Sequence, residues 1–412
     1  MSAATRDHRS ASPSLLYLMI TIVIVGLNFR APVLAVSPLL ETIMDATGVS
    51  SAVAGLLTTI PVVCFGLVSP FAPTLARRFG MDLTLVGVAA VLIAGILIRS
   101  MPATVALYGG TIIMGAAIAI GNVLLPGFVK REAPRRVGQM TAVYSAAISA
   151  SGALGAGITI PLMNALGLSW RGALGLTAIS SMFALLVLLP WLRSASDHRL
   201  RGGTRHAPTG LWRNRLAWFV TIYMGSQSLL FFSVAAWLPS LLIANGMSEA
   251  RAGFMLSISP LFGTAGSFIA PLLTDRRPDQ RWLIWLSTAM CVFGLVGLLV
   301  APVTATALWV VVFGFGSGMT LSLALTFIGL RSPDSHHAAE LSSMSQSVGY
   351  TLAALGPLLV GLIHDITGGW RMPILMILAF SVMLLVSGLG AARNRLVAPV
   401  TETRSNVIES HA

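Results

Sequence analysis

The chain has 412 residues and a formal net charge of +12, yet only 10% of its residues are charged and 55% are hydrophobic. A soluble domain has about 25% charged residues, so the composition argues against a soluble enzyme or binding domain. The positive charges lie in short stretches between long apolar runs, which argues against a nucleic-acid partner and predicts a protein embedded in a lipid bilayer.

Twelve apolar runs follow one another, each long enough to cross a bilayer, which takes about 20 residues. We predict membrane-spanning helices at residues 14–44, 50–74, 82–100, 103–129, 138–166, 170–193, 215–244, 249–274, 281–301, 304–330, 338–364 and 370–392. The stretch 194–214 has no apolar periodicity and is predicted to be a linker. The expected organisation is all-α: a tail (1–13), a six-helix bundle (14–193), the linker, a second six-helix bundle (215–392) and a second tail (393–412).

Two motifs occur once in each half of the chain. The pattern Gly-x-Ser-x-Ala-x-Ala-Gly at residues 48–55 recurs at residues 246–253, and Trp170-Arg171 recurs as Trp370-Arg371. Both copies lie at matching places in the series of apolar runs. A duplicated helical unit with the same order in each half is typical of a two-lobed membrane carrier.

The arginines predict the orientation of the helices. Of the 26 Lys and Arg residues, roughly 21 fall at one set of segment ends and 4 at the other, so the positive-inside rule places both termini in the cytoplasm. Helices 3, 6, 9 and 12 are nearly free of polar side chains at their centres, as in residues 85–93. Lipid cannot satisfy polar groups, so we expect every third helix to be peripheral and the others to surround a polar path.

The segment order and the two Trp-Arg pairs resemble the major facilitator superfamily, in which two six-helix bundles rock around a central site. The loop after segment 2, residues 73–82, also resembles that family's acidic and basic loop motif, but Arg77 stands where the acid is usual and Asp82 where a base is usual. The second copy keeps the acid as Asp275. The resemblance makes these charged residues candidate gate residues, together with Asn28 and Glu340.

Within the superfamily the chain resembles the cyanate/nitroimidazole (CynX/NimT) transporter family. The residues behind this resemblance are 28–32 (Asn-Phe-Arg-Ala-Pro), 121–126 (Gly-Asn-Val-Leu-Leu-Pro), Lys130-Arg131, Met140-Thr141 with Tyr144-Ser145, Gln227-Ser228 with residues 237–239, and Gly349-Tyr350 with Gly356-Pro357. The resemblance implies transport of small compact anions or small heteroaromatic compounds.

Arg30 is the one charged residue deep inside an apolar run. Such a charge costs about 2.5–3.5 kcal/mol on insertion scales, so something must compensate it. Either a water-filled cavity with an anionic ligand does so, through the forked guanidinium, or the side chain is locked to backbone carbonyls or to Asn122. Pro32 should loosen the backbone nearby.

Five further residues are candidates for contact with a transported solute. Asn122, Tyr144 and Gln227 lie at mid-depth in segments 4, 5 and 7, and Gln227 adjoins Ser228, which corresponds to Arg30 in the second half. Gln346 and Tyr350, with Ser343, share one face of segment 11 and form a polar stripe. Asn122 would alternatively orient Arg30 or form a hydrogen bond between helices, and Tyr144 would alternatively pack in the bundle core. Phe231, Phe232 and Trp237 would either wall the site or pack in the core.

The sequence lacks the motifs that are typical of several other functions. No Walker motif or His-Glu-x-x-His sequence occurs, so we expect no ATP-driven pump, no enzyme, no metal and no cofactor. The glycine runs at residues 152–157 and 314–318 favour close helix packing. Because no Asp, Glu or His lies at mid-depth, facilitated diffusion, anion exchange and proton-coupled transport all stay open.

Together these features predict a monomeric transporter of the bacterial inner membrane. It would move a small anion or weakly acidic solute by alternating access, with lipid and the solute as its partners. The alternative is an exporter of small heteroaromatic toxic compounds such as nitroimidazole-like drugs, in which the aromatic wall dominates and Arg30 matters less.

Overall fold

The computed structural model describes residues 14–49, 51–192, 210–274 and 277–397. Within these ranges the secondary structure is entirely helical. The helices are α1 (Leu15–Leu27), α2 (Ala31–Leu34), η1 (Ser37–Leu39), α3 (Leu40–Thr47), α4 (Ser51–Val68), η2 (Ser69–Phe71), α5 (Ala72–Phe79), α6 (Met81–Arg99), α7 (Thr104–Glu132), α8 (Val137–Ala165), α9 (Trp170–Leu188), η3 (Leu211–Arg213), α11 (Arg215–Ala244), α12 (Glu249–Thr274), α13 (Arg281–Val300), α14 (Thr306–Leu330), α15 (Ser335–Thr367) and α16 (Arg371–Ala391).

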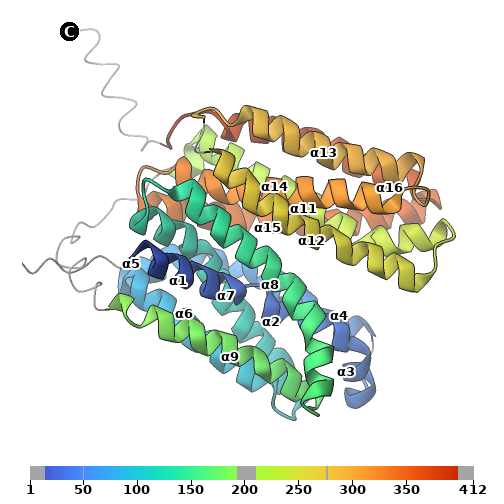
Figure 1. Cartoon of the computed structure of the whole chain (residues 1–412), viewed down its shortest axis with the longest axis horizontal. Helices are drawn as coiled ribbons and strands as arrows, with labels where there is room; N and C mark the ends of the chain where they lie inside the picture. The colour runs from blue at the N-terminus through green and yellow to red at the C-terminus, as the bar shows by residue number, and fades with distance from the viewer. Residues whose placement is uncertain (1–13, 50, 193–209, 275–276, 398–412) are drawn as a thin grey trace, which may run out of the picture.

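Figure 1 shows two helical bundles side by side, one built from α1 to α9 and the other from α11 to α16. In the described ranges, eleven helices are long and apolar enough to cross a membrane, or twelve when α8 is counted with its 47° bend. The predicted all-α fold with two pseudo-symmetric bundles is therefore confirmed. Most of the predicted linker lies outside the described residues, so the domain limits stay a prediction.

The first segment is broken, whereas one helix was expected over residues 14–44. α1 ends at Leu27, a turn covers residues 28–30, and α2 begins at Ala31 with Pro32 in its first turn. Proline has no N–H and disfavours helical geometry in the residue before it, so a break at this place follows from the sequence. The corresponding helix of the second bundle, α11, runs without interruption.

The second segment differs from its prediction at the other end. The chain from residue 75 to residue 79 was expected to be loop, but it continues the helix as α5, which ends at Phe79 before the positive-φ residue Gly80. Arg77 and Arg78 therefore lie on a helix that prolongs α4 beyond the membrane-spanning part. A helix holds these side chains in place better than a loop would.

Glycines bring helices into backbone contact, as predicted for the two glycine runs. A Cβ added at Gly318 of α14 would lie 1.9 Å from the carbonyl oxygen of Gly263 in α12, and one at Gly155 of α8 would lie 2.5 Å from the carbonyl oxygen of Ala31. No side chain fits at these distances. In lipid, where no hydrophobic effect drives helices together, such close approach gives dispersion contacts that hold the bundle.

The outer helices are the ones expected. α6 and α9 pack on helices of the first bundle, and α13 and α16 pack on helices of the second. The two bundles meet instead through α8 against α12 and α14, and through α4 and α7 against α15. The polar side chains predicted at mid-depth therefore lie on the helices that face the bundle interface.

An arginine ties neighbouring helices in each bundle. Arg131 of α7 pairs with the carboxylate of Asp82 on α6. At the corresponding place in the second half, Arg331 binds the side-chain oxygen of Gln280 and the carbonyl oxygen of Ala391. Asp82 was expected to be a gate residue; in this structure its buried carboxylate is held within one bundle, where the pair stabilises the bundle itself, and the gate role stays a prediction.

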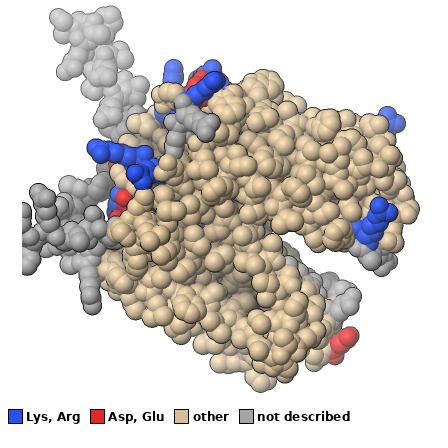
Figure 2. Space-filling view, in the orientation of Figure 1, with Lys and Arg blue, Asp and Glu red and all other residues tan. Residues whose placement is uncertain are grey.

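The two bundles are closed against each other at one end and separated at the other. Figure 2 shows Lys and Arg side chains gathered at the left end, and a notch between the bundles at the opposite end. Near the charged end, Ser343 of α15 donates to the carbonyl oxygen of Ser69 at 2.9 Å, and Ser347 donates to that of Gly66 at 2.8 Å. The interface between the bundles therefore widens away from the charged end.

Candidate functional site

Two adjoining pockets lie between the bundles, and they share Arg30, Phe232 and Leu321. Each encloses about 450–470 Å³, part of it open to solvent. The first is also lined by Gln227 and the second by four more of the predicted residues, Asn122, Tyr144, Gln346 and Tyr350. The structure thus brings together all six residues that the sequence nominated, from five separate segments of the chain.

The broken first segment places Arg30. The backbone N–H groups of Arg30 and Ala31 both donate to the hydroxyl of Ser151 on α8, at 3.2 and 2.8 Å. A hydroxyl from a neighbouring helix thereby satisfies donors that the break leaves without helical partners. This anchoring fixes the backbone of Arg30 and directs its long side chain to the junction of the two pockets.

The guanidinium of Arg30 has no hydrogen-bonding partner in the described part of the chain. The contact recorded for it is the ring of Phe231, whose centroid lies 5.8 Å from its central carbon. The alternative in which Arg30 is locked to carbonyls or to Asn122 is therefore wrong. Its five N–H donors are available to an anionic or strongly polar group in the cavity.

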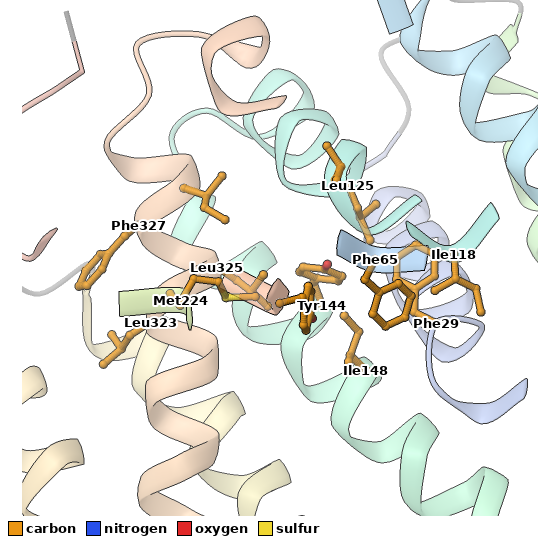
Figure 3. Packing of buried hydrophobic residues seen from close by; sticks show 14 of the residues in the cluster. Phe29, Phe65, Ile118, Leu125, Tyr144, Ile148, Met224, Leu323, Leu325 and Phe327 are labelled. Carbon is orange, nitrogen blue, oxygen red and sulfur yellow. The ribbon is translucent and has the colours of Figure 1, made fainter. Parts of the chain in front are cut away.

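Aromatic rings line the second pocket, together with the polar side chains of Arg30, Asn122 and Gln346. Figure 3 shows Tyr144 with Phe29 and Phe65 on one side and Met224 on the other. The Tyr144 hydroxyl is 3.4 Å from the side-chain oxygen of Asn122, a weak hydrogen bond. Tyr350 of the second bundle packs on Phe65 of the first, with ring centroids 5.3 Å apart. Rings from both bundles therefore meet in this pocket.

Two glutamines that line the pockets already use amide N–H groups in hydrogen bonds within the protein. Gln346 donates its amide hydrogens to the carbonyl oxygen of Asn122 at 3.0 Å and to the hydroxyl of Ser342 at 2.9 Å, so it joins the two bundles beneath the pocket. Gln227 donates to the hydroxyl of Ser228 at 2.6 Å. The side-chain oxygen of each amide remains available for other contacts. Because N–H groups of both amides already donate within the protein, neither side chain offers the cavity a full set of donors.

The first pocket is lined by small residues. Ser149, Ser228, Ser259 and Ser317 contribute hydroxyls, and glycines of α12 and α14 contribute bare backbone. Phe231 and Phe232 line the cavity, whereas Trp237 packs on Trp370 and donates to the carbonyl oxygen of Pro357 at 2.9 Å. Of the three aromatics considered, two wall the site and Trp237 packs in the second bundle.

The polar stripe of α15 divides between two roles. Gln346 and Tyr350 line the pocket as expected, but Ser343 lies one turn closer to the charged end and is 7% exposed. Its hydroxyl bonds to Ser69 across the interface. In this conformation Ser343 lies in the closed interface and not in the pockets, because the bundles already touch at its depth.

The gate candidates also fall into two groups, one that joins the two bundles and one that bonds within a single bundle. Arg77 of α5 forms an ion pair with Glu340 of α15 at 2.9 Å, which joins the bundles at the charged end. Asn28 instead accepts hydrogen bonds from Ser180 and Ser181 of α9 and is 1% exposed. In this structure Asn28 stabilises the break in the first segment, and its gate role stays a prediction. Asp275 lies outside the described residues.

Arg99 escaped the sequence analysis. It stands at the end of α6, where it was counted as a loop residue, yet it is fully buried. Its guanidinium donates to the carbonyl oxygen of Pro32 at 2.7 Å and to the hydroxyl of Thr177 at 3.2 Å. No periodicity marks such a residue, because a position at a helix end is equally consistent with solvent and with a neighbouring helix.

One group with metal-ligand chemistry occurs among the described residues. Atoms of Asp334, His336 and His337 lie within 4.8 Å of one another at the start of α15. Asp334 accepts from the backbone N–H of His337 at 2.8 Å and contacts its ring nitrogen at 2.9 Å. Burial raises the pKa of Asp334, but these hydrogen bonds outweigh it and hold the pKa below its usual value. Helix capping accounts for the arrangement.

Comparisons with known proteins agree with this architecture. Residues 18–355 match the Major Facilitator Superfamily. The chain is 41% identical over 379 residues to the 2-nitroimidazole transporter of Escherichia coli, covering 92% of this chain and 96% of that protein. It is 29% identical over 359 residues to the cyanate transport protein CynX of Escherichia coli, covering 86% and 92%.

A solved structure supports the fold. The proton:xylose symporter XylE bound to 6-bromo-6-deoxy-D-glucose superposes with a TM-score of 0.73 at 13% identity, covering 94% of this chain and 98% of that one. An identity this low speaks for the fold alone. The match to the superfamily over most of the chain and the high identity to a nitroimidazole transporter confirm the resemblance stated from sequence motifs. The chain belongs to the Major Facilitator Superfamily, as a relative of the nitroimidazole and cyanate transporters.

Proposed function

We propose that this protein carries a small anion or weakly acidic solute across the bacterial inner membrane. The observation that carries the proposal is the unpaired guanidinium of Arg30 at the junction of the two pockets. A forked cation in a cavity of low polarity binds a carboxylate-like group through two parallel hydrogen bonds. The names of the cyanate and nitroimidazole relatives support a solute of small size.

The other predicted residues would orient the solute. Asn122 and Tyr144 lie together in the first bundle, and Gln227, Gln346 and Tyr350 face them from the second. A solute that touches both sets would be held by both bundles at once. Such shared contact is what couples binding to the rocking motion of the bundles in alternating access.

The positive-inside rule supports an orientation with the charged end in the cytoplasm. In that orientation the bundles are closed towards the cytoplasm and separated towards the outside (Figure 2). The Arg77–Glu340 ion pair and the serine hydrogen bonds of α15 would then form the cytoplasmic gate. Opening this gate while the outer notch closes would expose the same pockets to the other side.

A second function is favoured by the aromatic pocket. A flat heteroaromatic compound would be held there by aromatic rings with little help from charge. The rings are those of Phe29, Phe65, Phe232, Tyr144 and Tyr350. An exporter of nitroimidazole-like compounds would use these rings chiefly. The two functions differ in their dependence on Arg30, since a neutral ring needs no cation.

Thermal unfolding of the detergent-solubilised protein tests both. Cyanate, formate, benzoate and 2-nitroimidazole are added separately to the wild type, to Arg30→Ala and to Arg371→Ala, a control that removes an exposed arginine outside both pockets. A bound solute stabilises the folded state by about 2.7 kcal/mol at 100 times its Kd.

The proposal expects stabilisation by at least one of the three anions in the wild type and the control, and none in Arg30→Ala. Stabilisation by 2-nitroimidazole that persists in Arg30→Ala would favour the heteroaromatic exporter. Equal stabilisation of all three proteins by an anion would overturn the role of Arg30.

A further inference from the structure

Arg30 differs from three other arginines, Arg99, Arg131 and Arg331, in what its guanidinium contacts. The guanidinium of Arg99 is fully buried but donates to a backbone carbonyl and a hydroxyl. Arg131 pairs with Asp82, and Arg331 binds Gln280 and a backbone carbonyl. Each of these cations has hydrogen-bonding or ionic partners supplied by the protein, and of the Arg99 guanidinium only Nε is left buried without one. Protein groups therefore partner these three guanidinium groups, whereas no hydrogen-bonding group in the described ranges partners that of Arg30.

The cavity around Arg30 contains no compensating charge. Among the described residues that line the two pockets there is no Asp, Glu or His. The polar groups present are hydroxyls and amides, which lower the cost of a nearby cation without neutralising it. While the bundles are separated at one end, water entering through the notch hydrates Arg30. When both ends are closed, that hydration is reduced.

Alternating access requires such a closed intermediate, both for the loaded carrier and for the empty carrier on its return. An uncompensated guanidinium in a closed cavity pays a desolvation penalty that slows the step about 100-fold or more. An anion bound to Arg30 removes most of this penalty, because the pair is neutral. The empty carrier is therefore kinetically trapped, and the loaded carrier is not.

We propose that this protein is an anion exchanger. Its binding site switches from one side of the membrane to the other only when an anion is bound at Arg30, so each anion carried one way is matched by an anion carried back. The cation of Arg30 thus acts as the element that forbids return of the empty carrier. This inference rests on the proposed binding of an anion at Arg30, but it can be tested before the natural solute is known.

The test measures interconversion of the empty protein by single-molecule fluorescence energy transfer. Dyes are attached at Arg135→Cys and Asn394→Cys, exposed positions of the two bundles, in a background where the two free cysteines, Cys64 and Cys291, are replaced by alanine. Wild type, Arg30→Gln, Arg30→Met and the control Arg371→Gln are compared in a buffer whose anion is the disaccharide acid lactobionate, and again with formate added. Formate is small enough to reach any arginine in an open cavity.

The expected result is that both Arg30 variants interconvert about 100-fold faster than wild type and control without formate. Formate should accelerate wild type and control and leave the variants unchanged. Equal rates for wild type and the Arg30 variants without formate would overturn the inference, as would formate that accelerates all proteins equally or none. These outcomes are separate from the thermal-shift result, so exchange can fail while anion binding stands.

Discussion

The guanidinium of Arg99 donates to the carbonyl oxygen of Pro32 at 2.7 Å and so ties an outer helix to the break in the first segment. Pro32 lies two residues after Arg30, and Asn28, two residues before it, is held by serines of α9. The break is thus fixed on both sides of the residue that enters the cavity. The second bundle, whose α11 is unbroken, has Gly297 in the region that corresponds to Arg99.

Replacing Arg99 should destabilise the protein. Arg99→Gln removes the donor to Pro32 and leaves a buried carbonyl without a partner, which costs about 1–3 kcal/mol. The measurement is thermal unfolding in detergent without solute. Arg371→Gln, which removes an exposed arginine, should change stability by less than about 0.5 kcal/mol. An Arg99→Gln protein as stable as wild type would show that the contact contributes nothing to the stability of the fold.

Replacing Arg30 should show how much of anion binding depends on its positive charge and how much on its planar, forked shape. Arg30→Lys keeps the positive charge but loses the planar fork, so we expect it to weaken binding of the stabilising anion about tenfold or more, and Arg30→Ala to abolish binding. Binding is measured by calorimetry on purified protein, at equal folded fraction. Wild-type affinity in Arg30→Lys would mean that the site recognises charge alone.

The ion pair between Arg77 and Glu340 should have a modest effect on the conformational balance. The Arg77 side chain is 44% exposed, so solvent screens the pair, and such pairs contribute about 0.2–1 kcal/mol. Arg77→Gln should therefore shift the population towards opening at the charged end by a factor of up to about five, read from the same dye pair.

The charge-exchanged double variant, Arg77→Glu with Glu340→Arg, should restore the original balance. A double variant that behaves like the sum of its two single variants would contradict a direct pairing across the bundles.

Close packing of α12 on α14 gives a prediction that is independent of the cavity. Gly318→Ala places a methyl group against the backbone of Gly263, which forces the helices apart and should cost about 1–3 kcal/mol. Gly253→Ala on the same α12 is the matched control, because nothing lies within 4 Å of its added Cβ. Equal melting temperatures for the two variants would argue against the backbone contact.

The sequence predicted the fold and most of the site through one constraint. A bilayer offers no hydrogen bonds, so long apolar runs must be helices and a polar side chain at mid-depth must face protein or water. That reasoning placed the spans, identified the outer helices, and nominated Arg30, Asn122, Tyr144, Gln227, Gln346 and Tyr350, which the structure brings to the same two pockets.

The direction in which each polar side chain points was decided by the tertiary structure. Asn28 turns to α9, Asp82 to α7, and Ser343 to the closed interface, although each looked like a gate or cavity residue in sequence. Arg99, at a segment end, could have faced solvent or a neighbouring helix, and it is buried. The position of a residue within its apolar run indicates how deep it lies in the bilayer, whereas its partners depend on how neighbouring helices approach and rotate. That is set by close packing among residues far apart in the chain.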